Sequence, residues 1–150
     1  MNLELIENLN VAYIRRIGPY GSDNYAVMDS LKKWAEITGR LEGGVIYAIA
    51  YDDPDGNPQH CRFDACLVVE PDFVPEEPVQ KGLIQGGMHA IFEVRHSAYA
   101  MELFWSHLYE NMEKATDMLA SHYKTHDLQK LSDQAWNALG ATQQKNITDE

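Results

Sequence analysis

The side chain in this sequence that most needs a chemical explanation is a carboxylate inside a predicted strand. Asp64 falls within the run 62–69, which is rich in strand-forming residues. Because side chains alternate along a strand, Asp64 shares a face with Cys66 and Val68. A carboxylate among apolar neighbours needs a partner or a function, since burying an isolated charge is costly. Two interpretations follow: Asp64 binds a ligand, or it hydrogen-bonds the preceding loop and fixes the hairpin. The opposite face of this strand carries Phe63, Ala65 and Leu67.

Aromatic side chains are the second feature that could do chemistry. A wall of aromatic rings suits flat or cationic ligands, because ring faces are electronegative and contribute roughly 0.5–2 kcal/mol per good cation contact. Glu102, in a predicted helix, could add an anionic group, although a helix-surface glutamate is more often simply solvated. Each aromatic residue could equally be ordinary core. The residues that we expect to line a binding site, besides Asp64 and Glu102, are Tyr20, Tyr47, Tyr51, Phe92, Trp105 and Tyr109.

The other reactive side chains form no recognisable catalytic or metal-binding pattern. His122 and His126 have the i,i+4 spacing that can hold a metal on one helical face, but no third ligand is evident. Cys61 and Cys66 fall on opposite faces of one predicted strand and so cannot easily bridge each other, and their spacing is not that of a zinc site. We therefore expect reduced thiols, no metal, no cofactor and no enzymatic activity.

Composition and charge indicate which classes of protein this chain can belong to. The chain has 150 residues, 45% of them hydrophobic and 23% charged, which is one ordinary globular domain covering residues 1–150. The net charge of −11 repels phosphate backbones, so we expect no direct nucleic-acid binding, and it favours cationic ligands at long range. No apolar run is long enough to cross a membrane, and the first residues do not resemble a signal peptide. We therefore expect a cytoplasmic protein without a membrane partner.

The first half of the chain predicts the order strand, helix, strand, strand. The residues at 3–17 favour one extended segment with a break near 8–10, and a helix follows between Ser22 or Asp23 and Gly39. Two strand-like runs, 45–51 and 62–69, flank an Asp-Pro-Asp-Gly turn.

The second half resembles the first at offsets of 77 to 78 residues. We expect repeat one at about 3–70, repeat two at about 79–123, and a helical tail at 124–150. The apolar spacing predicts one long helix over residues 99 to about 122 and another over 127–139, with no closing strands. A sheet without its last strands exposes an edge and an apolar face, so we expect a homodimer.

Four motifs, in order, closely resemble those of the GyrI-like small-molecule-binding family, which also supplies the effector-binding domain of AraC- and MerR-type transcription regulators. The resemblance covers roughly residues 3–112 and implies an α+β fold of two strand-helix-strand-strand units. His96 to Ala98 replace the second Gly-Pro-Tyr, and no residue matches the glutamate that the family carries in its closing strands. The four motifs are Ala12-Tyr-Ile-Arg-Arg-Ile-Gly-Pro-Tyr-Gly21, Tyr51-Asp-Asp-Pro54, Cys61-Arg-Phe-Asp-Ala-Cys-Leu67 and Gly86-Gly-Met-His-Ala-Ile-Phe92.

The resemblance implies a groove for amphipathic, often cationic, drug-like molecules. Because the family pattern begins at the third residue, we expect a stand-alone small-molecule-binding module rather than a regulator with its own DNA-binding segment. Two alternatives from other classes stay open. One is a hydrolase of small electrophilic compounds that uses Glu102 or Asp64 as its base. The other is an interaction subunit that meets a partner regulator through residues 124–150.

Overall fold

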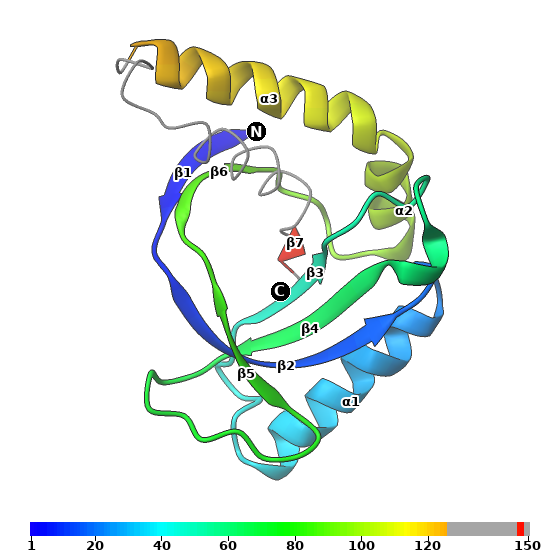
Figure 1. The fold of residues 1–150 in the computed structure, drawn as a ribbon, viewed down its shortest axis with the longest axis vertical. Helices are drawn as coiled ribbons and strands as arrows, with labels where there is room; N and C mark the ends of the chain where they lie inside the picture. Colours follow the sequence, from blue (N-terminus) through cyan, green and yellow to red (C-terminus); the bar gives the residue numbers. More distant parts are fainter. Residues whose placement is uncertain (126–146, 149–150) are drawn as a thin grey trace. The chain divides into compact units, whose positions relative to one another are not determined.

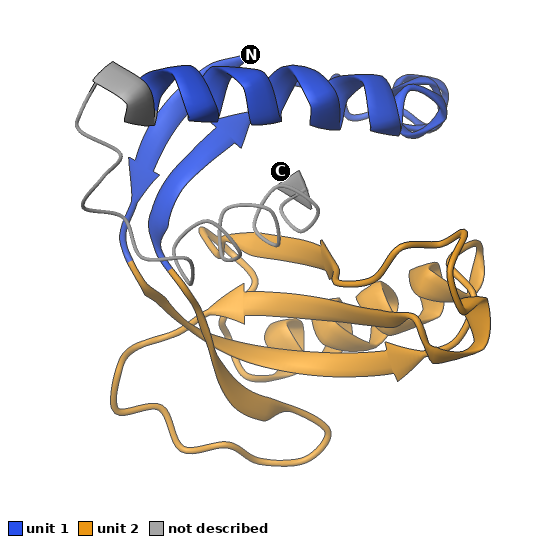
Figure 2. Ribbon diagram, turned by 45° about the horizontal axis from the view of Figure 1, so that its top comes forward, with its two compact units in different colours: residues 1–7, 86–144 blue, residues 8–85, 145–150 orange. Residues whose placement is uncertain are grey.

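The computed structural model describes residues 1–125 and 147–148. It shows an α+β fold with two sheets and with helices, as the sequence predicted. The chain forms two compact units (Figure 2). Unit 1 comprises residues 1–7 and 86–144, and unit 2 comprises residues 8–85 and 145–150. The repeat boundaries expected from the sequence stay predictions.

Unit 2 contains a five-stranded sheet in which every neighbouring pair is antiparallel. The strand order is β5-β2-β4-β3-β7, and a single turn of 3-10 helix, Pro58–His60, precedes β4. Helix α1, Asp23–Ile37, runs along one face of this sheet (Figure 1). The strands are β2 at Leu9–Ile17, β3 at Ile46–Ala50, β4 at Arg62–Val68, β5 at Gln80–Ile84 and β7 at Ile147–Thr148.

The main core of unit 2 lies between α1 and the sheet. The predicted helix is confirmed, and its buried residues are Met28, Leu31, Trp34 and Ala35. They pack with side chains from one face of β4, and the helix ends before Gly39, whose φ of 72° suits a glycine. The β4 residues in this core are Phe63, Ala65 and Leu67. The predicted alternation along β4 is thus confirmed, and Asp64 lies on the face away from α1.

Unit 1 contains a two-stranded antiparallel sheet and two helices. Strand β1, Asn2–Ile6, pairs with β6, Gly87–Ile91. The break that we expected between β1 and β2 is present at residues 7–8. Helix α3, Leu108–Thr125, contacts β6 and buries Ala115 and Leu119.

The expectation of one unbroken helix over residues 99–122 is wrong. Helix α2, Ala98–Ser106, ends at His107, which has the non-helical dihedrals φ −107° and ψ 21°. The Ser106 hydroxyl donates to the Leu103 carbonyl at 2.7 Å, and His107 Nδ1 lies 2.9 Å from the same oxygen. Side chains that bond nearby carbonyls in this way compete with the helical backbone pattern, which explains the break.

The expectation of no closing strands is also wrong. Two residues near the end of the chain, Ile147 and Thr148, pair antiparallel with Ala48 and Tyr47 of β3. Both are β-branched, and they pair with backbone groups that would otherwise form an open sheet edge. The helix expected at 127–139 lies outside the described residues, and the homodimer stays a prediction.

Candidate functional site

The sheet face of unit 2 opposite α1 collects polar and aromatic side chains from three strands. The register of β2, β4 and β3 places Tyr13, Cys66 and Tyr47 in one cross-strand row. The next row contains Arg15, Asp64 and Ile49. The third contains Ile17 and Arg62, and the Tyr51 N–H donates to the Arg62 carbonyl at 3.2 Å. We call this surface the tyrosine face and define it by Tyr13, Arg15, Tyr47, Tyr51, Arg62, Asp64 and Cys66.

The buried carboxylate at the centre of this face has a partner in the neighbouring strand. Arg15 Nε and Nη2 donate to the two Asp64 oxygens at 2.7 and 2.8 Å. The side chain of Asp64 is 2% exposed, whereas that of Arg15 is 36% exposed. The hydrogen bonds to Asp64 raise the pKa of Arg15. The charge that had to be accounted for at Asp64 is therefore compensated within the sheet rather than by the preceding loop.

The guanidinium groups of two arginines lie beside tyrosine rings. The Arg15 guanidinium is 5.4 Å from the Tyr13 ring centre and 5.3 Å from that of Tyr51. Arg62, paired to Asp52 by two hydrogen bonds of 3.0 Å, lies 5.0 Å from the centre of the same Tyr51 ring. Burial raises the pKa of the Tyr51 hydroxyl, and the Asp64 charge raises it further. Tyr51 therefore stays neutral beside the two cations at physiological pH.

The ring of Tyr13 depends on a glycine in the edge strand. Gly82 of β5 lies opposite Val11, and a Cβ added at Gly82 would come within 2.8 Å of Tyr13 Cε1. The Tyr13 hydroxyl donates to Gln80 Oε1 at 2.9 Å, which holds the ring over β5. The missing side chain at Gly82 is thus what allows the ring to lie there.

Cys66 forms an inert part of this face. Its side chain is buried in the cross-strand row that it shares with Tyr13 and Tyr47. Burial raises the pKa of its thiol, with a further contribution from the negative charge of Asp64. A neutral buried thiol is a poor nucleophile, so Cys66 serves as a small apolar side chain.

Tyr20, predicted to line the site, has a different position. Its ring packs against the core beside α1. Its hydroxyl donates to the Arg62 carbonyl at 2.8 Å and accepts from the Asp52 N–H at 3.0 Å. Tyr20 therefore ties the ends of β3 and β4 to the loop that follows β2.

The other predicted site residues belong to unit 1. Phe92 makes an edge-on contact with Phe104, with ring centres 5.6 Å apart, and Phe104 makes a similar contact with Trp105 at 5.9 Å. Glu102 and Tyr109 are exposed on α2 and α3. Of the predicted set, the structure brings together Tyr47, Tyr51 and Asp64 on one surface.

Sequence reasoning missed Tyr13, Arg15 and Arg62 as members of this surface. The alternation of β2 does put Tyr13 and Arg15 on one side of that strand, so a signal existed. What the sequence did not provide was the register that sets Arg15 opposite Asp64.

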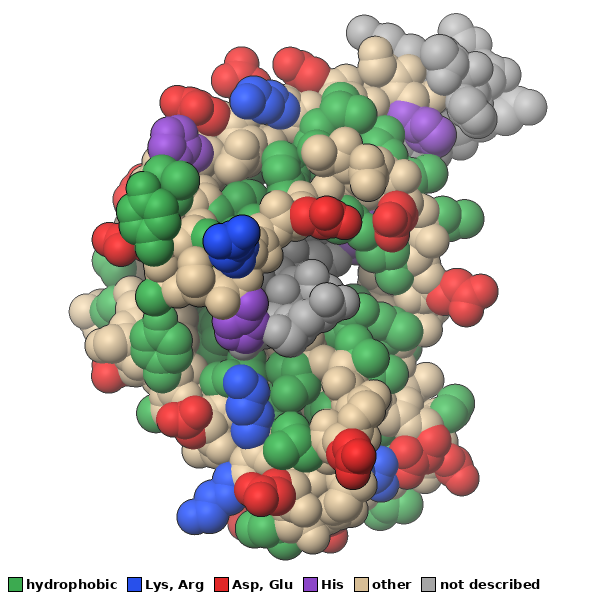
Figure 3. Space-filling model, turned by 180° about the vertical axis from the view of Figure 1, so that it is seen from behind, with side chains coloured by type: hydrophobic (Ala, Val, Ile, Leu, Met, Phe, Trp, Pro, Cys, Tyr) green, Lys and Arg blue, Asp and Glu red, His purple; other side chains and the backbone are tan. Residues whose placement is uncertain are grey.

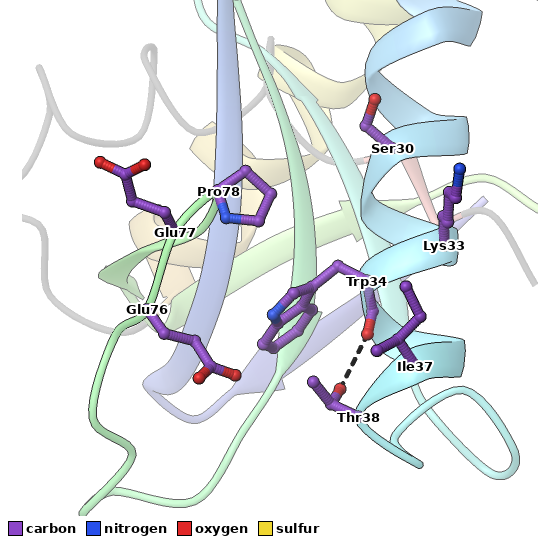
Figure 4. Close-up of a pocket in the computed structure, with 8 residues that line it drawn as sticks. All are labelled: Ser30, Lys33, Trp34, Ile37, Thr38, Glu76, Glu77 and Pro78. Atoms are coloured by element: carbon purple, nitrogen blue, oxygen red, sulfur yellow. Dashed lines mark hydrogen bonds between the residues drawn. The ribbon is translucent and has the colours of Figure 1, made fainter.

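A separate pocket of about 460 Å³ lies beside α1 (Figure 4). Trp34 forms one wall, and its Nε1 is buried without a hydrogen-bond partner among the described residues. The Thr38 hydroxyl donates to the Trp34 carbonyl at 2.9 Å. Exposed charged side chains form much of the remaining pocket lining, so the pocket lacks the aromatic surface of the tyrosine face. Its lining residues are Ser30, Lys33, Trp34, Ile37, Thr38, Glu76, Glu77 and Pro78.

The described part of the chain contains neither a cluster of metal ligands nor a candidate membrane span. No group of three or more His, Cys, Asp or Glu side chains there is placed to hold a metal ion. His126, half of the predicted histidine pair, lies outside that part. Among the helices described, none combines the length and apolar character that a membrane span requires.

Comparison with known proteins places these features in a family context. The model of the family described as "GyrI-like small molecule binding domain" matches residues 1–133. A Bacillus subtilis (strain 168) protein named "SPbeta prophage-derived putative transcriptional regulator YosT" is 36% identical over 116 residues, which cover 76% of this chain and 78% of that protein. The crystal structure of the EcmrR C-terminal domain matches with a TM-score of 0.48 and 14% identity, over 73% of this chain and 74% of that one. A structural likeness this distant carries no argument about function.

Proposed function

Because the chain belongs to the GyrI-like small-molecule-binding family, we propose that it is a cytoplasmic module that binds an aromatic, amphipathic small molecule on its tyrosine face. The observation that carries this proposal is the clustering of Tyr13, Tyr47 and Tyr51 on one side of a single sheet. All three are only partly buried, and α1 packs on the opposite side. Rigid, partly exposed aromatic rings are the surface on which flat ligands stack.

The charge of the protein supports ligands that carry a positive group. With a net charge of −11, the chain attracts cations at long range. Figure 3 shows acidic side chains scattered over the visible surface. The ring face of Tyr47, which has no arginine beside it among the described residues, gives such a cation a local partner as well. Multidrug-like binding of lipophilic cations is therefore part of the proposal.

Binding is favoured over the two alternatives considered from the sequence. A hydrolytic base must have a free carboxylate, whereas Asp64 is buried and already bonded to Arg15. Glu102 is a solvent-exposed residue of α2. The interaction-subunit alternative depends on residues 124–150, nearly all of which lie outside the described part of the chain.

Fluorescence anisotropy of rhodamine B, a flat amphipathic dye, tests the proposal. We expect saturable binding that Tyr47→Ala weakens about tenfold, because loss of a stacked ring costs roughly 1–2 kcal/mol. Tyr25→Ala is the matched control, since Tyr25 is 70% exposed on α1 in the same unit. Equal losses in both variants, or no loss in Tyr47→Ala, would contradict the assignment of the site.

A further inference from the structure

The geometry of the two arginines points to a more specific ligand. We propose that Arg15 and Arg62 together bind an oxyanion, so that the ligand of the tyrosine face is an aromatic compound with a carboxylate. This inference rests on the proposed function and names the ligand class of the same site. It also assigns to Asp64 and Asp52 the role of holding the arginines in place rather than binding the ligand.

Toward the described residues, each guanidinium uses one edge of its donor fork. Arg15 donates hydrogen bonds from Nε and Nη2 to Asp64, and Arg62 donates from the same two atoms to Asp52. A guanidinium carries five N–H groups, so the Nη1 edge of each is left to donate outward. Among the described residues, neither Nη1 atom has a hydrogen-bond partner. The side chains are 36% and 43% exposed, so a ligand can reach them.

The two arginines are neighbours on the same face of the sheet. In the register, Arg15 pairs with Asp64, and Arg62 precedes Asp64 by two positions, so the arginines are diagonal neighbours on the same face. Both guanidiniums lie within about 5 Å of the Tyr51 ring centre. Hydrogen bonds to Asp52 raise the pKa of Arg62, and the like charge of Arg15 opposes that rise. An oxyanion placed between them removes that repulsion.

The same geometry argues against a cation at this position. Two carboxylates could attract one: Asp64 is 2% exposed and covered by Arg15, and Asp52 is 31% exposed but bonded through both oxygens to Arg62. A cationic group at either carboxylate would compete with the guanidinium of a two-point ion pair. The charged groups most exposed to a ligand at this part of the face are therefore the two guanidiniums. A planar carboxylate matches an arginine fork in shape as well as charge.

The inference is compatible with a cation elsewhere on the ligand. The net charge of −11 disfavours a purely anionic molecule at long range. A zwitterionic aromatic compound suits both the two arginines and the negative net charge of the protein. Its carboxylate meets Arg15 and Arg62, its ring stacks on the tyrosines, and its positive group experiences the acidic field of the protein.

Rhodamine B and its ethyl ester provide a matched test. They share the same cationic ring system and differ in whether the carboxylate is free. We expect the free acid to bind about tenfold more tightly, because charge-assisted hydrogen bonds are lost in the ester. Arg62→Gln should remove most of this preference, mainly by weakening the free acid. Arg40→Gln is the control. Arg40 makes a similar two-point ion pair, with Glu70, but it lies over Trp34 and Phe73 of the core beside α1.

Arg15 requires a variant that keeps the protein folded. Arg15→Gln alone would leave Asp64 buried without its cation, so the double variant Arg15→Leu/Asp64→Leu removes both charges together. Circular dichroism checks its fold, and its preference for the free acid should be lost. If both dyes bind equally and Tyr47→Ala still weakens them, the proposed function stands and the carboxylate inference is overturned. If neither dye binds the parent protein, both fail. A preference that survives in Arg62→Gln and in the double variant also overturns the inference.

Discussion

Asp64 and Arg15 face each other directly across β4 and β2, joined by hydrogen bonds of 2.7 and 2.8 Å. The carboxylate is buried while the guanidinium reaches the surface. The pair therefore converts a buried negative charge into a fixed, outward-facing positive group. We propose that this relationship governs both the stability of the tyrosine face and the kind of ligand that it binds.

Breaking this pair from one side should be costly. We expect Asp64→Ala to lower the free energy of unfolding by about 2–4 kcal/mol, because it strands the Arg15 charge and empties a buried site. This expected loss is smaller than that for breaking a fully buried ion pair, since Arg15 remains partly hydrated. Arg15→Leu/Asp64→Leu should lose less than Asp64→Ala, because no charge is left unpaired. Urea titration measures both, and a loss under about 1 kcal/mol in Asp64→Ala would contradict the importance of the pair.

A methyl group at Gly82 should disturb the site more than the fold. The added Cβ would press on the Tyr13 ring, which can swing outward because it is only partly buried. We expect Gly82→Ala to weaken rhodamine B binding about fivefold while changing the free energy of unfolding by less than about 1.5 kcal/mol. Leu83→Ala, at an exposed neighbouring position in β5, is the control. Unchanged binding in Gly82→Ala would show that the position of Tyr13 does not matter.

Tyr20 should matter for stability and not for ligand contact. Tyr20→Phe removes a hydroxyl that both donates to the Arg62 carbonyl and accepts from the Asp52 N–H. We expect a loss of about 1–3 kcal/mol in the free energy of unfolding, because partly buried backbone groups lose their partner. Affinity for the dye should stay within about twofold once the variant is folded. A large loss of affinity without loss of stability would return Tyr20 to the ligand-binding set.

The ion pair between Arg40 and Glu70 should make the stability of the protein depend partly on acid pH. Hydrogen bonds from Arg40 lower the pKa of Glu70 to about 2. Because the folded value lies below the ordinary value of about 4.3, this contribution to stability is present above that pH. It is lost as the pH falls toward 2. Denaturant titrations between about pH 5 and pH 2 should show a shallower decline for Glu70→Gln than for the parent protein. Identical slopes would show that the pair makes no contribution.

The elements that could be predicted from the sequence are those fixed by short-range patterns. Helix α1, the alternation along β4 and the turn between β3 and β4 follow from residue spacing and turn chemistry, and the structure confirms them. The break at His107 was missed because it depends on side-chain hydrogen bonds to the Leu103 carbonyl. Strand β7 was missed because two residues carry no periodicity.

The site was predicted only in part, because it depends on contacts between residues that are distant in the sequence. Tyr47, Tyr51 and Asp64 were named from their types, but their neighbours come from β2, about 50 positions earlier in the chain than β4. Only the strand register shows that Arg15 neutralises Asp64. Without the register, Asp64 could equally bind a ligand or hydrogen-bond the loop.

The most direct test of the tyrosine face is the position of a bound ligand. Intermolecular nuclear Overhauser effects between rhodamine B and protein side chains report which protons lie within about 5 Å. We predict contacts from the dye ring to the side chains of Tyr13, Tyr47 and Tyr51, and from its carboxyphenyl group to Arg15 and Arg62. Contacts confined to Trp34 and its pocket, or to α2 and α3, would contradict the site proposed for this protein.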